Sequence, residues 1–185
     1  MKMGHRMLRF ARREDGVAAI EMAIIFPVML IMFFGLIDLT ALISDSRRVS
    51  YAAHVVGDDL IRLETPTTPG DVADSFAAAE IMMGAARAGP ARVEIYNFRR
   101  VAGQAVLRWD IDNGVGQPCG APNPQSLGDL MVAGNDVLVT VVCERHTPII
   151  AIFLGKMILG RLEFTLREQI AMRPRAGNFL ECPDC

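Results

Sequence analysis

The residues best suited to chemistry in this 185-residue sequence are its four cysteines, Cys119, Cys143, Cys182 and Cys185. The last two form a Cys-x-x-Cys pair, which is redox-active when it opens a helix in a thioredoxin-like unit. Here no helix follows the pair, so we favour disulfides, which persist in an oxidising compartment. Three connectivities are possible, and the sequence does not choose among them. A tetrahedral zinc site is less favoured, because only one Cys-x-x-Cys is present.

Other catalytic patterns are missing from the sequence. It contains no Gly-rich phosphate loop, no Gly-x-Ser-x-Gly and no His-Glu-x-x-His. Its histidines, His5, His54 and His146, are scattered along the chain, and a lone helix histidine such as His54 is more often structural than catalytic. We therefore predict a protein that is not an enzyme and that uses neither a metal nor another cofactor.

Charge is unevenly distributed along the chain. The net charge of −2 provides no broad basic surface, so we expect no nucleic-acid partner. A cluster of basic residues nevertheless precedes a long apolar run, and basic residues flank the cytoplasmic ends of membrane helices. The sequence thus predicts a cytoplasmic N-terminus and a C-terminal domain across the membrane. The basic residues are Lys2, Arg6, Arg9, Arg12 and Arg13.

The apolar run has the length of a membrane span. Val17 to Ile37 contains one charged residue, Glu21, and at about 1.5 Å per residue it extends roughly 31 Å, close to the bilayer hydrocarbon thickness. Asp38 follows at the far boundary, where a carboxylate is expected to reach water. The run is longer than the apolar part of a secretory signal peptide and lacks a good Ala-x-Ala site, so ordinary signal cleavage is disfavoured.

Glu21 is expensive in hydrocarbon unless it is paired. If the chain is cut after Gly16, Val17 carries a new α-ammonium group four residues before Glu21, about one helical turn away. The ammonium and the carboxylate can then neutralise each other, within one chain or between neighbouring chains. Between chains, this pairing would select one axial offset of stacked helices.

At these residues the sequence resembles the class III signal sequences of type IV pilins, with a glycine at the cut and a glutamate at the fifth mature position. Gly16 and Glu21 match this pattern. The stretch "GVAAIEMAIIFPVMLIMFFGLIDL" is further similar to TadE-like minor pilins, or pseudopilins, of tight-adherence (Tad/Flp, type IVb-like) pilus systems. Those proteins have a proline within the helix and an acidic residue near its end, as Pro27 and Asp38 are placed here. The resemblance is specific over residues 12 to 45 and loose beyond them.

The resemblance implies a minor pilin that takes part in assembling a pilus for surface adherence. A prepilin peptidase of the bacterial inner membrane would cut after Gly16, Val17 would become the first residue, and Glu21 would be the assembly residue. The implied partners are this peptidase, other pilins, the Tad assembly machinery and membrane lipid. The alternative is a permanently anchored single-pass periplasmic protein, acting as a binding module or as a thiol-disulfide factor through Cys182 and Cys185.

Two helices are predicted to position these residues. The membrane helix is expected to continue without a break as an amphipathic rod, which ends in the Pro-rich residues 64 to 70. A second helix is predicted from Asp71, acting as its cap, to about Ala88. The apolar stripe of the first helix beyond the membrane is Val49, Ala52, Ala53, Val56, Leu60 and Leu63, and that of the second is Val72, Phe76, Ala79 and Met83.

Strand patterns follow the helices and indicate an α+β fold with about four antiparallel strands. A tight turn at 102 to 104 joins the first two strands, and Leu107, Trp109 and Ile111 are expected on one face of the second. Residues 136 to 144 are apolar on both faces, as in a central strand. The expected strands are 92 to 101, 105 to 112, 136 to 144 and 161 to 171.

Two segments fit no regular element. Residues 113 to 135 form a Gly/Pro/Asn-rich loop, and residues 147 to 160 form either a buried crossover helix or an apolar patch for a partner or the membrane surface. The predicted organisation is therefore a basic cytoplasmic leader at 1 to 16, removed by cleavage, a transmembrane helix at 17 to 44, and a periplasmic pilin-like domain at 45 to 185.

Overall fold

The computed structural model describes residues 15–63, 67–84, 91–128, 130–149, 163–175 and 177–185. These residues form two α-helices, a short 3-10 helix and a four-stranded antiparallel sheet of order β2-β1-β3-β4, which confirms the predicted α+β class. The elements in chain order are α2 (Asp15–Leu60), α3 (Pro69–Met83), β1 (Arg92–Val101), β2 (Gln104–Asp112), η1 (Pro124–Leu127), β3 (Asp136–His146) and β4 (Phe164–Met172).

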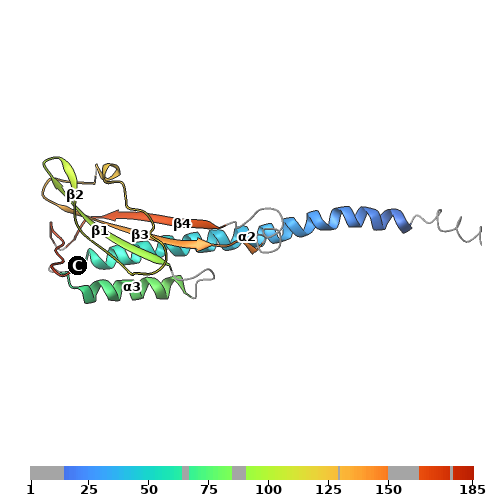
Figure 1. Cartoon of the computed structure of the whole chain (residues 1–185), viewed down its shortest axis with the longest axis horizontal. Coiled ribbons are helices and arrows are strands. Elements are labelled where there is room, and N and C mark those ends of the chain that lie inside the picture. The colour runs from blue at the N-terminus through green and yellow to red at the C-terminus, as the bar shows by residue number, and fades with distance from the viewer. Residues whose placement is uncertain (1–14, 64–66, 85–90, 129, 150–162, 176) are drawn as a thin grey trace, which may run out of the picture.

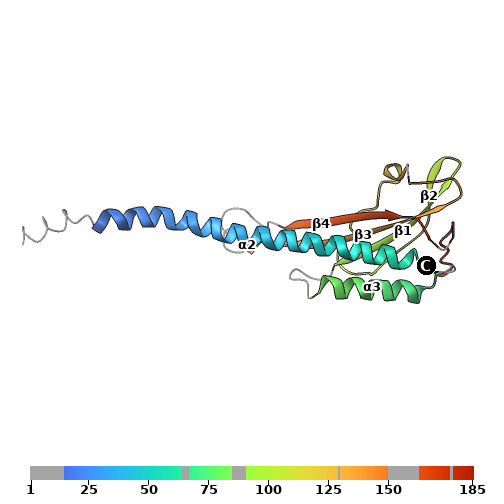
Figure 2. The ribbon, with the colours of Figure 1, turned by 180° about the vertical axis from the view of Figure 1, so that it is seen from behind.

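One continuous helix, α2, forms the long axis of the molecule. It has 46 residues and runs through Pro27 and Gly57 without a break, as predicted. Its N-terminal half projects far beyond the sheet, whereas its C-terminal half lies along the sheet beside α3 (Figures 1 and 2). The change in environment follows the sequence, because the apolar residues surround the helix in its first half and collect into a stripe in its second half.

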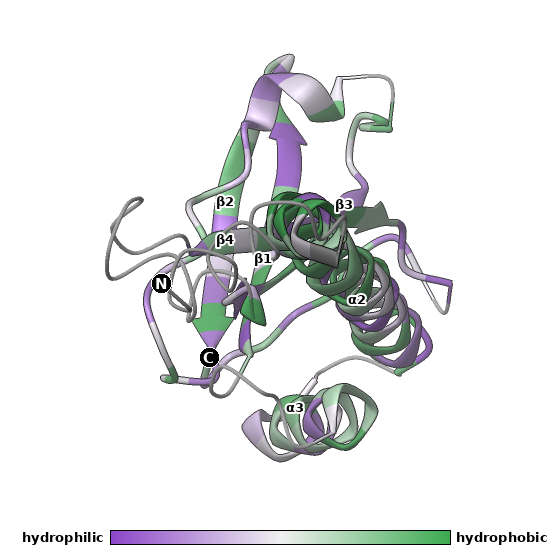
Figure 3. Cartoon of the chain, turned by 90° about the vertical axis from the view of Figure 1, so that its right-hand side faces the viewer, coloured by the Kyte–Doolittle hydropathy of each residue, from purple (hydrophilic) through white to green (hydrophobic). Residues whose placement is uncertain are grey.

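The helix face of the sheet carries the larger core. Figure 3, viewed from the N-terminal end of α2, shows α2 and α3 side by side on the same side of the sheet. The stripe predicted from helical spacing is buried against this face, because a period of three to four residues places its members on one side of a helix. The buried hydrophobic residues of α2 are Val49, Ala52, Ala53, Val56 and Leu60, each at most 1% exposed, and Ile61 follows the helix at 3%.

Strand β3 is central and buried on both faces, as its apolar sequence predicts. Leu138 and Val142 face the helices, while Val137, Val139 and Val141 belong to a second apolar cluster on the opposite face. The loop between β2 and β3 covers that opposite face through Leu127 and Met131. The sheet is therefore a middle layer between two helices and a long loop.

The β1–β2 hairpin has a turn of two residues. Ala102 and Gly103 both have positive φ, 50° and 84°, the combination of a type I′ turn, whose twist matches that of the strands. Gln104 is already paired with Val101, so the second strand starts one residue earlier than predicted. Gly103 accommodates its positive φ readily, whereas Ala102 adopts the left-handed region that an alanine disfavours.

The expectation that Leu107 shares a face with Trp109 and Ile111 is wrong. Trp109 pairs with Asn97 and Leu107 pairs with Phe98, so the register shifts at this point and one extra residue, Arg108, lies in β2. Because strand side chains alternate, a one-residue bulge moves Leu107 to the opposite face. Trp109 and Ile111 pack against the helix-side core, and Leu107 is 44% exposed.

The second helix starts earlier and ends earlier than predicted. Thr68, rather than Asp71, is the N-cap: the Asp71 backbone N–H donates to Thr68 Oγ1, and Asp71 Oδ2 accepts from the Thr68 backbone N–H at 2.8 Å. This reciprocal pair is a capping box, which admits Pro69 in the first turn. The helix ends at Met83 because Gly84 adopts a φ of 67°, so the predicted end near Ala88 is wrong.

Several predicted segments reach outside the described residues. The apolar segment 147 to 160 lies there from residue 150 onward, and the first two residues of the last predicted strand, 161 and 162, lie there as well. The described strand β4 starts at Phe164 and ends at Met172, one residue beyond the prediction. Residues 1 to 14 of the predicted leader also lie outside the described residues.

Candidate functional site

The exposed half of α2 is the most conspicuous candidate site. Every residue from 16 to 33 is exposed, and the helix from Gly16 to Leu60 is long and apolar enough to cross a membrane. Its most apolar stretch of 18 residues has a mean hydropathy of 2.5, and none of the residues of that stretch is buried. A surface this apolar is unfavourable in water, so it requires lipid or other helices around it.

The three residues predicted for processing and assembly lie at the start of this helix. Gly16 is in its first turn, and a Cβ placed on Gly16 would meet no atom within 4 Å. Val17 is 58% exposed and Glu21 is exposed as well. Residues four apart lie above one another on a helix, so Val17 and Glu21 share one face.

Pro27 lies within the exposed half and does not interrupt α2. A proline has no backbone N–H, so the carbonyl four residues earlier, that of Ala23, loses its helical partner. Such carbonyls are tolerated in membrane helices when neighbouring groups satisfy them. Pro27 therefore leaves the backbone carbonyl of Ala23 without its helical hydrogen-bond donor.

Asp38 does not meet water as expected. It is only 8% exposed, and its Oδ1 accepts a hydrogen bond from the backbone N–H of Ile149 at 2.7 Å. The chain that follows β3 thus runs back to the level of Asp38 on α2. The packed part of α2 consequently begins at Asp38, immediately after the apolar span, instead of farther along the helix.

A cluster of buried ionisable side chains lies beside Asp38, where α2 leaves the domain; we call this region the neck. His146 Nδ1 is 2.8 Å from Asp45 Oδ2, and both residues are less than 9% exposed. Glu144 lies next to them and is 8% exposed. Burial and the negative charge of Asp45 raise the pKa of the Glu144 carboxyl, although Arg48 and His146 act in the opposite direction.

The neck also contains a pocket of about 280 Å³ between α2 and the end of β3. Sequence reasoning did not find this site. In the sequence His146 is only one of three scattered histidines, and Asp45 lies 101 positions away from it. Local patterns carry no information about such a distant pair, so only the packing of α2 on β3 brings the two residues together.

The structure selects one of the three possible cysteine pairings. Cys119 is joined to Cys143, with Cα atoms 5.7 Å apart, and Cys182 is joined to Cys185, with Cα atoms 5.3 Å apart. The first disulfide connects the long β2–β3 loop to the central strand. The second closes a short turn in the C-terminal tail.

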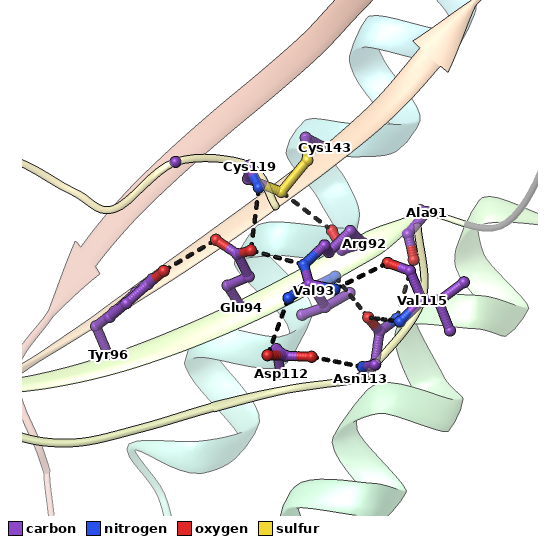
Figure 4. Close-up of polar contacts among 12 residues, drawn as sticks. Ala91, Arg92, Val93, Glu94, Tyr96, Asp112, Asn113, Val115, Cys119 and Cys143 are labelled. Carbon is purple, nitrogen blue, oxygen red and sulfur yellow. Dashed lines mark hydrogen bonds and ion pairs between the residues drawn. A yellow bond between two sulfur atoms is a disulfide. The ribbon is translucent and has the colours of Figure 1, made fainter. Parts of the chain in front are cut away.

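A network of charged groups holds the long loop beside the first disulfide (Figure 4). Glu94 Oε1 accepts hydrogen bonds from Arg92 Nε at 2.6 Å and from the Cys119 backbone N–H at 3.0 Å. Its Oε2 accepts from the Tyr96 hydroxyl at 3.0 Å. Burial and this contact raise the pKa of Tyr96 to about 12, so the phenol stays neutral. Arg92 also reaches Asp112 at 2.9 Å, and together these contacts fix the loop to the sheet.

The C-terminal tail is held by a second polar centre around Asp136, which is fully buried. Arg99 Nε donates to Asp136 Oδ1 at 2.6 Å, and the Leu180 backbone N–H donates to Oδ2 at 2.8 Å. The Leu180 carbonyl accepts from Asn97 Nδ2 at 2.8 Å and from Trp109 Nε1 at 2.9 Å. Leu180 itself enters the helix-side core, so the tail is an integral part of the domain.

The fold and this site define a class of protein: an α+β domain carried on one long N-terminal helix that could anchor it in a membrane. Comparison with known families agrees with that class. Residues 16–57 match the family model described as TadE-like protein, so the resemblance predicted from the sequence is confirmed over this segment. TadE-like proteins are pilin-type structural proteins rather than enzymes, and the match indicates a protein associated with a Tad pilus. No curated protein and no solved structure matches the chain.

Proposed function

We propose that this protein is a minor pilin, or pseudopilin, that takes part in assembling a Tad-type pilus for surface adherence, and that a prepilin peptidase cleaves it after Gly16. The observation that carries the proposal is the TadE-like match, which begins at Gly16 and extends to Gly57. In this proposal the leader, residues 1 to 16, is cytoplasmic and is removed. Residues 17 to 44 hold the chain in the bacterial inner membrane before assembly, and residues 45 to 185 lie in the periplasm.

The environment of Gly16 supports a cleavage site. A glycine within a helix costs up to about 1 kcal/mol relative to alanine, so it usually has a packing or conformational reason. Gly16 has neither, since the space around its Cβ position is open and its φ is not positive. A peptidase whose binding site rejects a larger side chain provides the missing reason from outside the chain.

The placement of Glu21 supports a role in assembly. After cleavage, the α-ammonium of Val17 and the carboxylate of Glu21 would lie about one helical turn apart on the same face. A carboxylate in hydrocarbon is costly unless it is paired, so the new ammonium removes a penalty that the uncleaved chain would carry. The pair forms within one chain or between neighbouring chains in a helical stack.

Processing tests the proposal directly. The full chain is expressed with its matching prepilin peptidase, and the N-terminus of the product is sequenced. We expect a start at Val17, and we expect Gly16→Phe to block cleavage. Gly35→Phe is the matched control, because Gly35 is also a helical glycine of α2 with no atom within 4 Å of its Cβ position. An intact N-terminus in a host that makes pili, or equal inhibition by both variants, would refute the proposal.

A further inference from the structure

A second pocket lies at the end of the domain farthest from the exposed half of α2; we call it the distal pocket. The β1–β2 hairpin extends beyond the rest of the sheet, because Val101 pairs with Gln104 while the last β1 residue paired with β3 is Arg99. Figure 1 shows β2 at the end of the molecule opposite the N-terminal half of α2. The distal pocket lies between this hairpin and η1 and has a volume of about 550 Å³, a size typical of small-molecule sites.

Arg100 supplies the positive charge of the distal pocket. Its Nη1 donates to the Met131 backbone carbonyl at 2.9 Å, which ties the guanidinium to the long loop. Its Nε and Nη2 have no partner within the described residues. Two such neighbouring N–H groups form the fork of a guanidinium, which binds two oxygens of a carboxylate or a phosphate in parallel. An anchored guanidinium with an unused fork is therefore preorganised to receive an oxyanion.

Two other arginines of the sheet use this fork within the chain. Arg99 donates from both Nε and Nη2 to Asp136, and Arg167 donates from the same two atoms to carbonyl oxygens of the long loop. In the distal pocket, no carboxylate is present among the described lining residues. The fork of Arg100 is therefore left for an anion that comes from outside the described chain.

The remaining polar side chains of the pocket are neutral amides. Gln104 of the hairpin and Gln125 of η1 are exposed, and neither amide has a partner within the described residues. A primary amide both donates and accepts hydrogen bonds, as a sugar hydroxyl does. The apolar side chains of the described lining are Ala105, Pro124 and Met131, and Met131 is only 4% exposed. The pocket therefore complements a ligand that is rich in hydroxyls and carries one oxyanion.

We propose that the distal pocket binds an acidic sugar of a surface polysaccharide. The carboxylate or phosphate of the sugar pairs with the fork of Arg100, and its hydroxyls bond to the amides of Gln104 and Gln125. A peptide suits the site less well, because its side chains need more apolar surface than this lining offers. The inference gives the surface adherence of the proposed function a chemical target, but the binding requires neither cleavage after Gly16 nor assembly into a pilus.

The test is equilibrium dialysis of the detergent-solubilised full chain against three sugars that differ only at C6. Glucuronic acid carries a carboxylate there, glucose 6-phosphate a phosphate ester and glucose a hydroxyl. We expect at least one of the two acidic sugars to bind about tenfold more tightly than glucose, the factor that a hydrogen bond to a charged group provides, and the tighter of the two identifies the oxyanion. Equal binding of all three sugars, or binding of none, overturns the proposal.

Small competitors separate the sugar from its charge. Acetate and inorganic phosphate should displace the acidic sugar about fivefold less effectively than the unlabelled sugar does, because they offer no hydroxyls to Gln104 and Gln125. Equal displacement by these ions would identify a general anion site and overturn the sugar assignment. Triglycine presents a peptide carboxylate, and displacement by triglycine as effective as that by the sugar would overturn the sugar assignment as well.

Variants locate the binding site. Arg100→Gln should weaken binding of the acidic sugar about tenfold, to the level of glucose, and Gln104→Ala should weaken it about fivefold. The matched control is Arg173→Gln, because Arg173 is exposed and also donates to a carbonyl of the long loop, that of Leu130 at 2.6 Å, but does not line the pocket.

The control variant should bind like the unmodified chain. Equal losses in the two arginine variants, or unchanged binding in Arg100→Gln, overturn the assignment to the distal pocket. Gln104 is exposed and its side chain bonds to no described residue, so unchanged binding in Gln104→Ala overturns the contact with the hydroxyls without a question of folding. Gly16→Phe should bind the acidic sugar like the unmodified chain, so a failure here is distinguishable from a failure of processing.

Discussion

The two disulfides should differ in their contribution to stability, because they close loops of different length. Cys119 and Cys143 are separated by 24 positions, and Cys182 and Cys185 by 3. A disulfide restricts the unfolded chain more strongly when its loop is longer. In the chain-entropy relation, the lost entropy of the unfolded chain stabilises the folded state by about 3.4 kcal/mol for the Cys119–Cys143 disulfide and by about 1.6 kcal/mol for the Cys182–Cys185 disulfide at 25 °C.

The folded state adds to this difference. The loop that carries Cys119 is anchored through its backbone N–H to Glu94, so loss of the disulfide also weakens a buried charge network. The tail that carries Cys182 is held independently, because the Thr67 backbone N–H donates to the Glu181 carbonyl at 2.8 Å and Leu180 is bonded to the Asp136 centre. Replacing Cys182 and Cys185 should therefore leave the tail in place.

The measurement is urea unfolding of the full chain in detergent, with tryptophan fluorescence as the signal that monitors unfolding. The chain has one tryptophan, and Trp109 donates to the Leu180 carbonyl, so its emission reports on the contact between sheet and tail. We expect the double replacement of Cys119 and Cys143 by serine to lower the free energy of unfolding by about 2 kcal/mol more than that of Cys182 and Cys185, at similar m values. Equal losses, or a larger loss for the C-terminal pair, would refute the loop-length reasoning.

Two further predictions concern single carboxylates. Burial alone would raise the pKa of Asp136, but the hydrogen bonds from Arg99 and from the Leu180 amide outweigh it and lower the pKa below the ordinary value of 3.8. The stabilisation by Asp136 is thus complete above about pH 4 and is lost as the pH falls through the lower folded-state pKa. Asp136→Asn should therefore lower the free energy of unfolding by about 3 kcal/mol at neutral pH, and the urea midpoint of the variant should depend less on pH below 4. A variant whose urea midpoint has the same pH dependence as the unmodified chain would contradict this. For Glu21→Ala, we expect normal cleavage after Gly16 but less protein in sheared pili by immunoblot, and undiminished recovery would show that the pairing argument is wrong.

The parts of the fold that the sequence predicted well are those governed by local rules. The stripe from Val49 to Leu60 is buried because helical periodicity alone decides which side of a helix is apolar. The position of the turn follows from Gly103, which adopts a positive φ readily, although Ala102 beside it also has a positive φ that alanine disfavours. Where a local choice had close competitors, the prediction failed: Asp71 is a good cap by type, but Thr68 three residues earlier forms the complete capping box with it.

The bulge in β2 shows how a small shift defeats pattern reasoning. Alternation places Leu107 with Trp109 only if the strand is regular, and the sequence gives no indication that Arg108 is an extra residue. The position of a bulge depends on the pairing of β2 with β1, and this is a contact between two segments. The same limit applies to the cysteines, since their pairing depends on where the long loop lies on the sheet.

The sequence by itself determined that a basic N-terminal stretch, a glycine, an early glutamate and a continuous apolar helix follow one another, because each feature is a property of neighbouring residues. The tertiary structure decided which cysteines meet and where α2 begins to pack. It also brought Asp45 and His146 together across 101 positions, and it buried Asp38, an expected surface residue, in the same neck. These outcomes depend on the fit of α2 against the end of β3, a packing of distant surfaces that residue spacing does not encode.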